Sequence, residues 1–499
     1  MKRSSFYDVY VLASLFLAFL IIILVQINNI IFLQPVPEIR FQFGQTIVTL
    51  ADINNDIYLR ELENQNGIIQ FDPMPLWTLT FASGTQDIIL RPSDFAVFQY
   101  QTYSDRLVLS WTGQTIVPQY TPISVTVEIK LGAQLQNDEG VGFTIQVDNE
   151  AQQALYNVAF PNMKIKPIGD SSKNVLFDPV GAGVLRRPFV DAPATIVRGN
   201  PSTESSMQFI SMYNYDLNKQ LYFQTLDSEG YSKDFVTAAD NNGVVLGVAQ
   251  YPENNVIPRL DYSQPYGIEM AVIRGNWYDA AKKYRVWALQ QPWASRGKIE
   301  TAPDFSQTLK DMRLYTLQNP SGVGQFPIPS GEFQKMMDEA IRVKNFFGLA
   351  NGMSMVHWYG WHNNQMDVEF PTSTTPLSGV TPALTATRAA GIIVMPYTLI
   401  NSWTLGSPAY ISNNVEPLTA RDRYGQQITS SSSSGQYLHA DIDPSIQQAR
   451  DLMRNRFLAA ITVGFIDGVY FDVWSYFLNI RDYRSTHGHQ PGGGNYWAK

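Results

Sequence analysis

The sequence contains no cysteine among its 499 residues. This absence excludes a disulfide framework, a cysteine zinc site, an iron–sulfur centre and a cysteine nucleophile. Histidine is also scarce, with five in the chain, so a histidine-rich metal store is not expected. The chain is nevertheless long enough to bury a large core without such covalent or metal supports.

Charge is low as well. Charged residues make up 16% of the chain, against about 25% in an average globular protein. The net charge of −8 argues against a nucleic-acid partner, because proteins that bind nucleic acid are usually basic. Aromatic residues reach 13%. A surface poor in charge and rich in aromatic rings suits a neutral, polyhydroxylated ligand such as a sugar.

The N-terminal segment carries a long apolar run. Lys2 and Arg3 precede the uncharged run Val9–Val25, which is about the length needed to cross a bilayer. No small-residue cleavage pattern follows it, which favours an uncleaved signal anchor over a cleaved signal peptide. The positive flank predicts a cytoplasmic N-terminus. The expected protein is therefore membrane-anchored, with the bulk of the chain extracellular or outward-facing.

The chain then divides by periodicity. In residues 37–275 apolar side chains alternate with polar ones, as at Val125, Val127 and Ile129, and many such short runs predict a β-sandwich. From residue 276 the spacing of Trp277, Ala280, Tyr284 and Trp287 predicts a helix, and a polar linker follows up to residue 310.

Residues 311–499 alternate between strand and helix patterns, which predicts a parallel sheet. The pattern alone leaves a (β/α) barrel and an open sheet as alternatives. The expected strands are Met312–Leu317, Ser354–Tyr359, Gly391–Tyr397 and Gly468–Asp472, and helices are expected over Glu332–Phe347, over Leu384–Ala390 and from Asp443 onward.

Asp472 is the main candidate for chemistry, because it ends an apolar strand among aromatic residues. Sites in parallel sheets lie at the carboxyl ends of the strands. Retaining glycosidases use two carboxyl groups about 5–5.5 Å apart, one of them as nucleophile. The alternative is a carboxylate that only hydrogen-bonds a ligand or caps a helix.

Two other clusters invite interpretation. His357, Trp358, Trp361 and His362 can form a platform on which a sugar ring stacks, or they can be ordinary core residues. The pair His487 and His489, with Asp482 nearby, resembles a metal-ligand pair. No third ligand stands at a supporting spacing, so neither a metal nor any other cofactor is predicted.

Taken in order, several segments resemble one family. They are Gln220–Asp227 with Lys233, Trp277–Trp287, His357–Trp361, Val394–Tyr397, Gly468–Asp472 and His487–Gly494. The chain resembles glycoside-hydrolase-like proteins of unassigned activity, which join a galactose-mutarotase-like β-sandwich to a (β/α)₈ barrel. That family is distantly similar to α-galactosidases and endo-α-N-acetylgalactosaminidases. The resemblance implies that Asp472 occupies the place of the nucleophile.

The resemblance also implies the fold. Together with the N-terminal apolar run, it predicts a multi-domain chain with a transmembrane segment at 1–36, an all-β sandwich at 37–275, a connecting helix and linker at 276–310, and an α/β unit at 311–499. The last unit would be the N-terminal half of a TIM-type barrel, with about four β/α units. The acid/base residue of such enzymes usually lies on a later strand, so it is expected outside this chain.

The predicted function is a retaining glycoside hydrolase that acts on extracellular glycans. The alternative is a non-catalytic carbohydrate-binding or structural surface protein. Expected partners are a carbohydrate and the membrane through the N-terminal helix. Three explanations of the half barrel stay open: the chain is a fragment, a second chain completes the barrel, or the half barrel has another role. Besides Asp472, the expected substrate-binding residues are Trp358, Trp361, His362, Tyr397, Asn401, Trp403, Trp474, His487 and His489.

Overall fold

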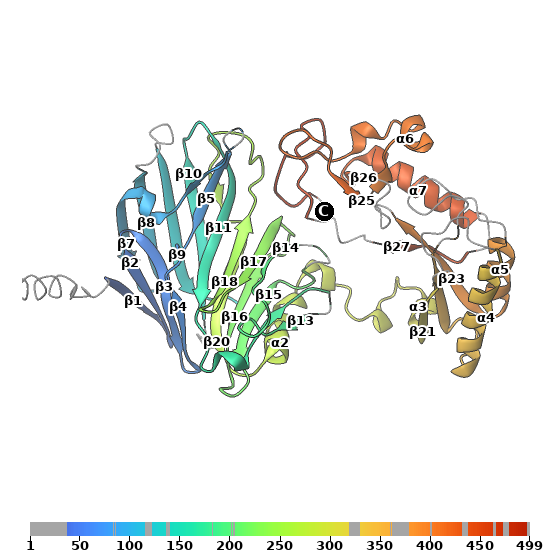
Figure 1. The fold of residues 1–499 in the computed structure, drawn as a ribbon, viewed down its shortest axis with the longest axis horizontal. Coiled ribbons are helices and arrows are strands. Elements are labelled where there is room, and N and C mark those ends of the chain that lie inside the picture. Colours follow the sequence, from blue (N-terminus) through green and yellow to red (C-terminus); the bar gives the residue numbers. More distant parts are fainter. Residues whose placement is uncertain are drawn as a thin grey trace, which may run out of the picture.

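The structure is a computed structural model, and it contains two units joined by a short connection (Figure 1). It describes residues 37–496 except for 83, 85, 115–121, 136–139, 182, 201, 203–204, 319–329, 360, 362–378, 400–401, 432–437, 463–465 and 473–478. The first unit is built from strands. The second unit mixes strands and helices.

Two ten-stranded antiparallel sheets form the first unit. The first sheet runs in the order β1 (Glu38–Phe43), β2 (Thr46–Ile53), β3 (Asp56–Asn64), β4 (Gly67–Asp72), β11 (Ala154–Ile165), β18 (Val244–Gln250), β17 (Lys233–Ala239) and β14 (Thr195–Asn200), with β5 (Thr78–Ala82) and β6 (Ile88–Leu90) attached through β11. The second runs β13 (Val184–Arg186), β12 (Asn174–Asp178), β15 (Phe209–Asn214), β16 (Lys219–Leu226), β20 (Gly267–Ile273), β10 (Gly140–Asn149), β9 (Ile123–Leu131), β8 (Arg106–Gln114) and β7 (Phe95–Thr102), with β19 (Tyr262–Ser263) on β10.

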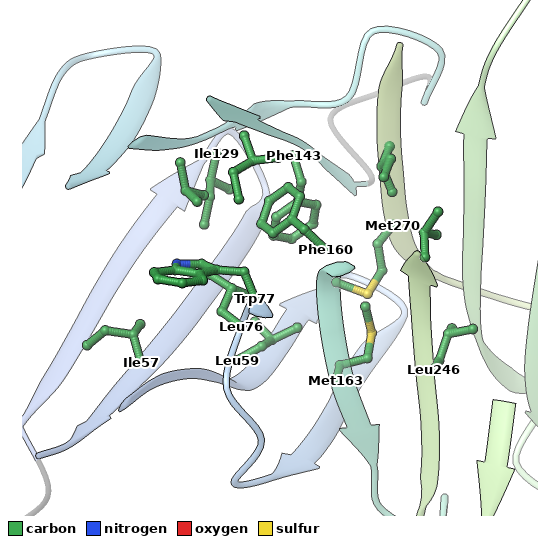
Figure 2. Packing of buried hydrophobic residues seen from close by; sticks show 14 of the residues in the cluster. Ile57, Leu59, Leu76, Trp77, Ile129, Phe143, Phe160, Met163, Leu246 and Met270 are labelled. Carbon is green, nitrogen blue, oxygen red and sulfur yellow. The ribbon is translucent and has the colours of Figure 1, made fainter. Parts of the chain in front are cut away.

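The core of this unit lies between the two sheets. Along β9, Val125, Val127 and Ile129 are buried while their neighbours are partly exposed, because successive side chains of a strand point to opposite faces. Apolar side chains from both sheets meet there, such as Phe160 of the first sheet and Phe143 of the second, whose ring centroids lie 6.4 Å apart (Figure 2). The alternation read from the sequence is therefore that of a sheet with one buried face.

Helix α2 (Trp277–Ala288) closes the second sheet near β15 and β16. Asn276 caps its first turn, and Ala280, Tyr284 and Trp287 are buried against that sheet. The helical spacing read from the sequence is confirmed here. The connection continues through the short helix α3 (Gln307–Asp311). The described residues include the short 3₁₀ turns η1 (Pro92–Asp94), η4 (Ser171–Lys173), η5 (Pro292–Ala294), η6 (Ile299–Thr301) and η7 (Glu416–Leu418).

The second unit contains a four-stranded parallel sheet whose strands follow one another in sequence order. Helices α4 and α5 pack on one face of it, where Phe333, Ala340 and Leu384 contact Val356 and Val394. The strands are β21 (Leu314–Gln318), β22 (Ser354–Trp358), β23 (Ile392–Leu399) and β27 (Tyr470–Asp472), and the helices are α4 (Ser330–Phe346) and α5 (Val380–Ala389).

A small antiparallel sheet follows β23. Its core includes Trp403, Ala440 and Met453, the last from a helix that leads toward β27. The elements are β24 (Ser402–Thr404), α6 (Pro408–Ser412), β25 (Thr429–Ser431), β26 (Leu438–Asp441) and α7 (Gln447–Thr462).

The segment after β27 returns to the sandwich. The Arg481 guanidinium lies 3.2 Å from the Asp234 carboxylate and 3.5 Å from the ring centroid of Tyr251. The amide of Ser232 donates to the carbonyl of Gly494 over 2.7 Å. In Figure 1 the segment of residues 479–496 accordingly lies between the two units.

The expected fold class is wrong and needs correction. Among the described residues strands dominate and helices are few, so the chain is mostly β, and the second unit contributes the four parallel strands that were expected for half a barrel. Local periodicity assigns segments one by one, and it did not reveal the small sheet of β24, β25 and β26 that interrupts the alternation of strands and helices. The expected transmembrane helix falls on residues 1–36, outside the described residues. Within residues 37–496, gaps aside, no helix combines the length and apolar character needed to cross a bilayer.

Candidate active site at the carboxyl ends of the parallel strands

Register and alternation bring a group of ring side chains together. In β22, His357 points to the face opposite Trp358, because side chains alternate along a strand. The His357 ring lies 3.8 Å from that of Tyr470 in β27 and 6.1 Å from that of Tyr397 in β23, measured between centroids. The sheet face away from α4 and α5 thus carries aromatic rings from three successive strands.

Asp472 ends β27 on this face. It is half-buried, and the hydroxyl of Tyr470 donates to its Oδ1 over 3.2 Å. Burial raises the pKa of Tyr470, and the Asp472 charge raises it further. Burial also raises the pKa of Tyr359 to about 12, with the Asp472 charge as a second cause. These phenols therefore stay protonated at neutral pH and remain available as hydrogen-bond donors.

Tyr315 joins the group from β21. Its hydroxyl lies 2.5 Å from Nδ1 of His357. Burial raises the pKa of Tyr315 to about 12, with smaller contributions from Tyr470, Tyr359 and Asp472. We name Tyr315, His357, Tyr359, Tyr397, Tyr470 and Asp472 the strand-end cluster.

His357 is a neutral member of the strand-end cluster. Its side chain is fully buried, and burial lowers its pKa to about 4 although the Asp472 charge acts in the opposite direction. Its Nε2 is buried and has no hydrogen-bond partner among the described residues. A neutral imidazole beside a carboxylate and phenols offers hydrogen bonds without adding positive charge.

The predicted substrate-binding residues fall into different places. Tyr397 belongs to the strand-end cluster. Trp358 is fully buried on the opposite face, 6.3 Å from the ring of Phe333, and Trp361 is buried in the same core. Trp403 is buried in the core of the small sheet. Buried rings present no open face to a sugar, so in this structure these three tryptophans are core residues. His362, Asn401 and Trp474 lie outside the described residues, and His487 and His489 lie together in a separate cluster described below.

Sequence reasoning missed the three phenols around Asp472, namely Tyr315, Tyr359 and Tyr470. A usable signal existed, because Tyr470 stands two positions before Asp472 and therefore shares its face. Tyr359 stands in the same relation to His357. Tyr315 could not be assigned in this way, because its contact with His357 depends on the pairing of β21 with β22.

The chain as a whole is similar to several known proteins. The model of the family described as "Domain of unknown function (DUF6259)" matches residues 262–499. The chain is 23% identical over 408 residues to a protein of Bacteroides thetaiotaomicron named "Putative glycoside hydrolase". It is 22% identical over 447 residues to "Putative glycoside hydrolase 22789" of Monosiga brevicollis. These alignments cover 80% and 84% of this chain, but 56% and 36% of the relatives.

Among solved structures, the α-N-acetylgalactosaminidase NagBb of Bifidobacterium bifidum has the same fold over most of the chain. The TM-score is 0.66 at 12% identity, over 91% of this chain and 72% of that one. The resemblance to glycoside-hydrolase-like proteins of unassigned activity, read from the sequence, is confirmed by these relatives.

The lowered pKa of His357 predicts how the stability of the fold depends on pH. The unfolded chain binds a proton at this histidine near pH 6.5, whereas the folded chain binds it only near pH 4. The free energy of unfolding is therefore expected to fall by roughly 2 kcal/mol as the pH drops from about 6.5 to 4. Denaturant titrations of the native protein and of His357→Gln at several pH values test this. The native protein should lose more stability than the variant between pH 6.5 and 5, and equal losses would contradict the assignment.

Proposed function

We propose that this chain is the nucleophile-bearing part of a retaining glycosidase, with Asp472 as the nucleophile. The observation that carries the proposal is the position of Asp472 at the carboxyl end of β27, half-buried and hydrogen-bonded by Tyr470. Parallel sheets place their reacting groups at this end of the strands. The glycoside-hydrolase relatives support a carbohydrate substrate.

In the proposed reaction, an Asp472 oxygen attacks the anomeric carbon, and the bond from that carbon to the leaving oxygen breaks. An acid/base residue outside this chain gives the leaving oxygen its proton. The same residue then removes a proton from water, which attacks the glycosyl–Asp472 ester and releases the sugar with its configuration retained. The hydroxyl of Tyr470 orients the carboxylate, and that of Tyr315 holds His357 beside it.

We further propose that the substrate is a glycan outside the cell and that a second chain can supply the acid/base residue. The relatives are longer than this chain, which spans 56% and 36% of them, and this supports further residues in the complete site. The apolar run Val9–Val25 supports an outward-facing location.

The test uses activated glycosides, because a leaving group of low pKa needs little help from an acid. The chain is incubated with dinitrophenyl glycosides of galactose and of N-acetylgalactosamine, each in both anomeric forms. A matching fluorinated glycosyl fluoride then serves as a trapping reagent. We expect a burst of phenol and a covalent glycosyl adduct on Asp472, found by peptide mass spectrometry.

The control is Asp338→Asn, which changes an exposed carboxylate on α4 and should label like the native protein. An adduct on another carboxylate would overturn the assignment of Asp472. Binding of glycans on an array, with neither adduct nor released phenol, would instead favour the non-catalytic carbohydrate-binding protein.

A further inference from the structure

A second cluster of titratable side chains lies outside the strand-end cluster. Asp443, Asp482, His487 and His489 each direct one possible ligand atom to a common centre, and these four atoms lie within 4.8 Å of one another. Both carboxylates are fully buried, and the two histidine side chains are at most 5% exposed. We name these four residues the His–Asp cluster.

The outer nitrogen of each imidazole is committed to a backbone carbonyl. Nε2 of His487 lies 2.9 Å from the carbonyl of Pro417, and Nδ1 of His489 lies 2.7 Å from that of Gln490. A carbonyl only accepts, so these two nitrogens carry the protons. In a neutral imidazole the inner nitrogen then presents a lone pair. This arrangement is typical of metal-binding histidines.

The inner nitrogens face carboxylate oxygens. Nδ1 of His487 and Nε2 of His489 lie 3.0 and 2.9 Å from Oδ2 of Asp443. Nε2 of His489 lies 3.4 Å from Oδ2 of Asp482, and His487 contacts that oxygen as well. A lone pair that faces a carboxylate oxygen is repelled unless a cation lies between them. The centre of the cluster is therefore built for positive charge.

Each carboxylate is oriented by its own hydrogen bonds. Oδ1 of Asp443 accepts from the amide of Ser445 over 2.8 Å, and Oδ1 of Asp482 accepts from the amide of Arg421 over 2.7 Å. In both residues Oδ2 faces the histidines, and Oδ2 of Asp443 also accepts from the hydroxyl of Ser445 over 2.8 Å. Tyr496 stacks on the ring of His489 with a centroid distance of 3.6 Å. The ligand atoms are thus held in place by surrounding groups, as in known metal sites.

We propose that the His–Asp cluster is a structural binding site for one divalent transition cation, with Zn²⁺ as the best match. Two neutral imidazoles and two carboxylates carry a charge of about −2, which one divalent cation neutralises. Bond lengths of about 2.0–2.1 Å in a tetrahedral zinc site place the ligand atoms about 3.3 Å apart. The histidine–carboxylate distances of 2.9, 3.0 and 3.4 Å are already close to that spacing, whereas the widest separation, within 4.8 Å, would have to shorten.

The chemistry of the ligands selects the cation. Two nitrogen ligands disfavour Ca²⁺ and Mg²⁺, which prefer oxygen. Four protein ligands leave no open coordination position, which is the pattern of structural rather than catalytic zinc. The site would anchor the segment that follows β27, because Asp482, His487 and His489 all belong to it. Sequence spacing does not reveal Asp443 as a ligand, because it stands 46 positions before His489.

The test measures metal in the folded full chain. The chain is treated with a chelator, incubated with Zn²⁺ and desalted, and its metal is then measured by mass spectrometry. We expect about one zinc per chain, a midpoint of thermal unfolding at least about 3 °C higher with zinc than without, and loss of both effects in His489→Gln. The control is His439→Gln, a histidine outside the cluster, which should keep one zinc per chain.

A competing state has two protons in place of the cation. Burial opposes the charge on the histidines, yet hydrogen bonds to Asp443 and Asp482 raise the pKa of both to about 9. No bound zinc and equal thermal midpoints with and without zinc would show this ion-pair network and overturn the proposal. If His489→Gln does not fold, X-ray absorption spectroscopy at the zinc edge of the native chain tests the site instead. It should show four nitrogen and oxygen neighbours at about 2.0 Å, and a six-oxygen shell would contradict the site.

Discussion

Replacing Asp472 with asparagine is expected to lower the turnover of an activated aryl glycoside by about 1,000-fold or more. The reason is that an amide lacks the charge and the free electron pair with which the carboxylate forms the glycosyl ester. The Michaelis constant should change little, because asparagine keeps the shape of the side chain and can still contact Tyr470. Steady-state kinetics of the native protein and of Asp472→Asn give the ratio directly.

Two controls separate a lost nucleophile from a lost fold. Asp338→Asn alters an exposed carboxylate on α4 and should keep native turnover. Asp472→Ala with added azide should regain part of the activity and form a glycosyl azide of inverted configuration, because the small anion attacks from the side that the carboxylate occupied. Unchanged turnover in Asp472→Asn would sink the assignment, whatever the azide experiment shows.

The second large effect is expected in the sandwich, where Asp227→Asn should destabilise the fold by about 3–5 kcal/mol. Asp227 pairs with Lys233, and both side chains are at most 1% exposed. Burial lowers the pKa of Lys233, while the Asp227 charge acts in the opposite direction. Without Asp227 a buried ammonium group would be left uncompensated. Equilibrium unfolding in urea measures the loss.

The matched control is Asp240→Asn. Asp240 also pairs with a lysine, Lys164, over 2.6 Å, but its side chain is 53% exposed. A solvent-exposed pair contributes less than about 1 kcal/mol, so this variant should unfold almost like the native protein. The double variant Asp227→Asn, Lys233→Met should recover part of the loss, because it removes the unpaired charge. Equal stability of the two single variants would contradict the assigned role of the buried pair.

Local periodicity was sufficient to predict single elements. The alternation in β9, the helical spacing in α2 and the four parallel strands were all readable from the chain. Each depends on neighbours only a few positions apart. Closure of the sheet was not readable, because it depends on how many strands pair and not on the pattern within any one of them.

In the candidate site, too, features within one strand were readable from the sequence and contacts between distant segments were not. Asp472 was readable as the polar end of an apolar strand, and its contact with Tyr470 lies within that strand. The treatment of His357 and Trp358 as one platform neglected alternation, which sends adjacent side chains to opposite faces. The His–Asp cluster was out of reach, since Asp443 joins the two histidines only through the folded path of the chain.

The return of the segment after β27 to the sandwich has a practical consequence. The Arg481–Asp234 pair and the Ser232–Gly494 hydrogen bond join the two units at a second place, far along the chain from the connection that follows α2. The second unit is therefore attached to the sandwich at both of its ends, by the covalent connection at one end and by these noncovalent contacts at the other. A protease cut in the connection would therefore release neither piece, and β27 would keep its orientation toward the sandwich.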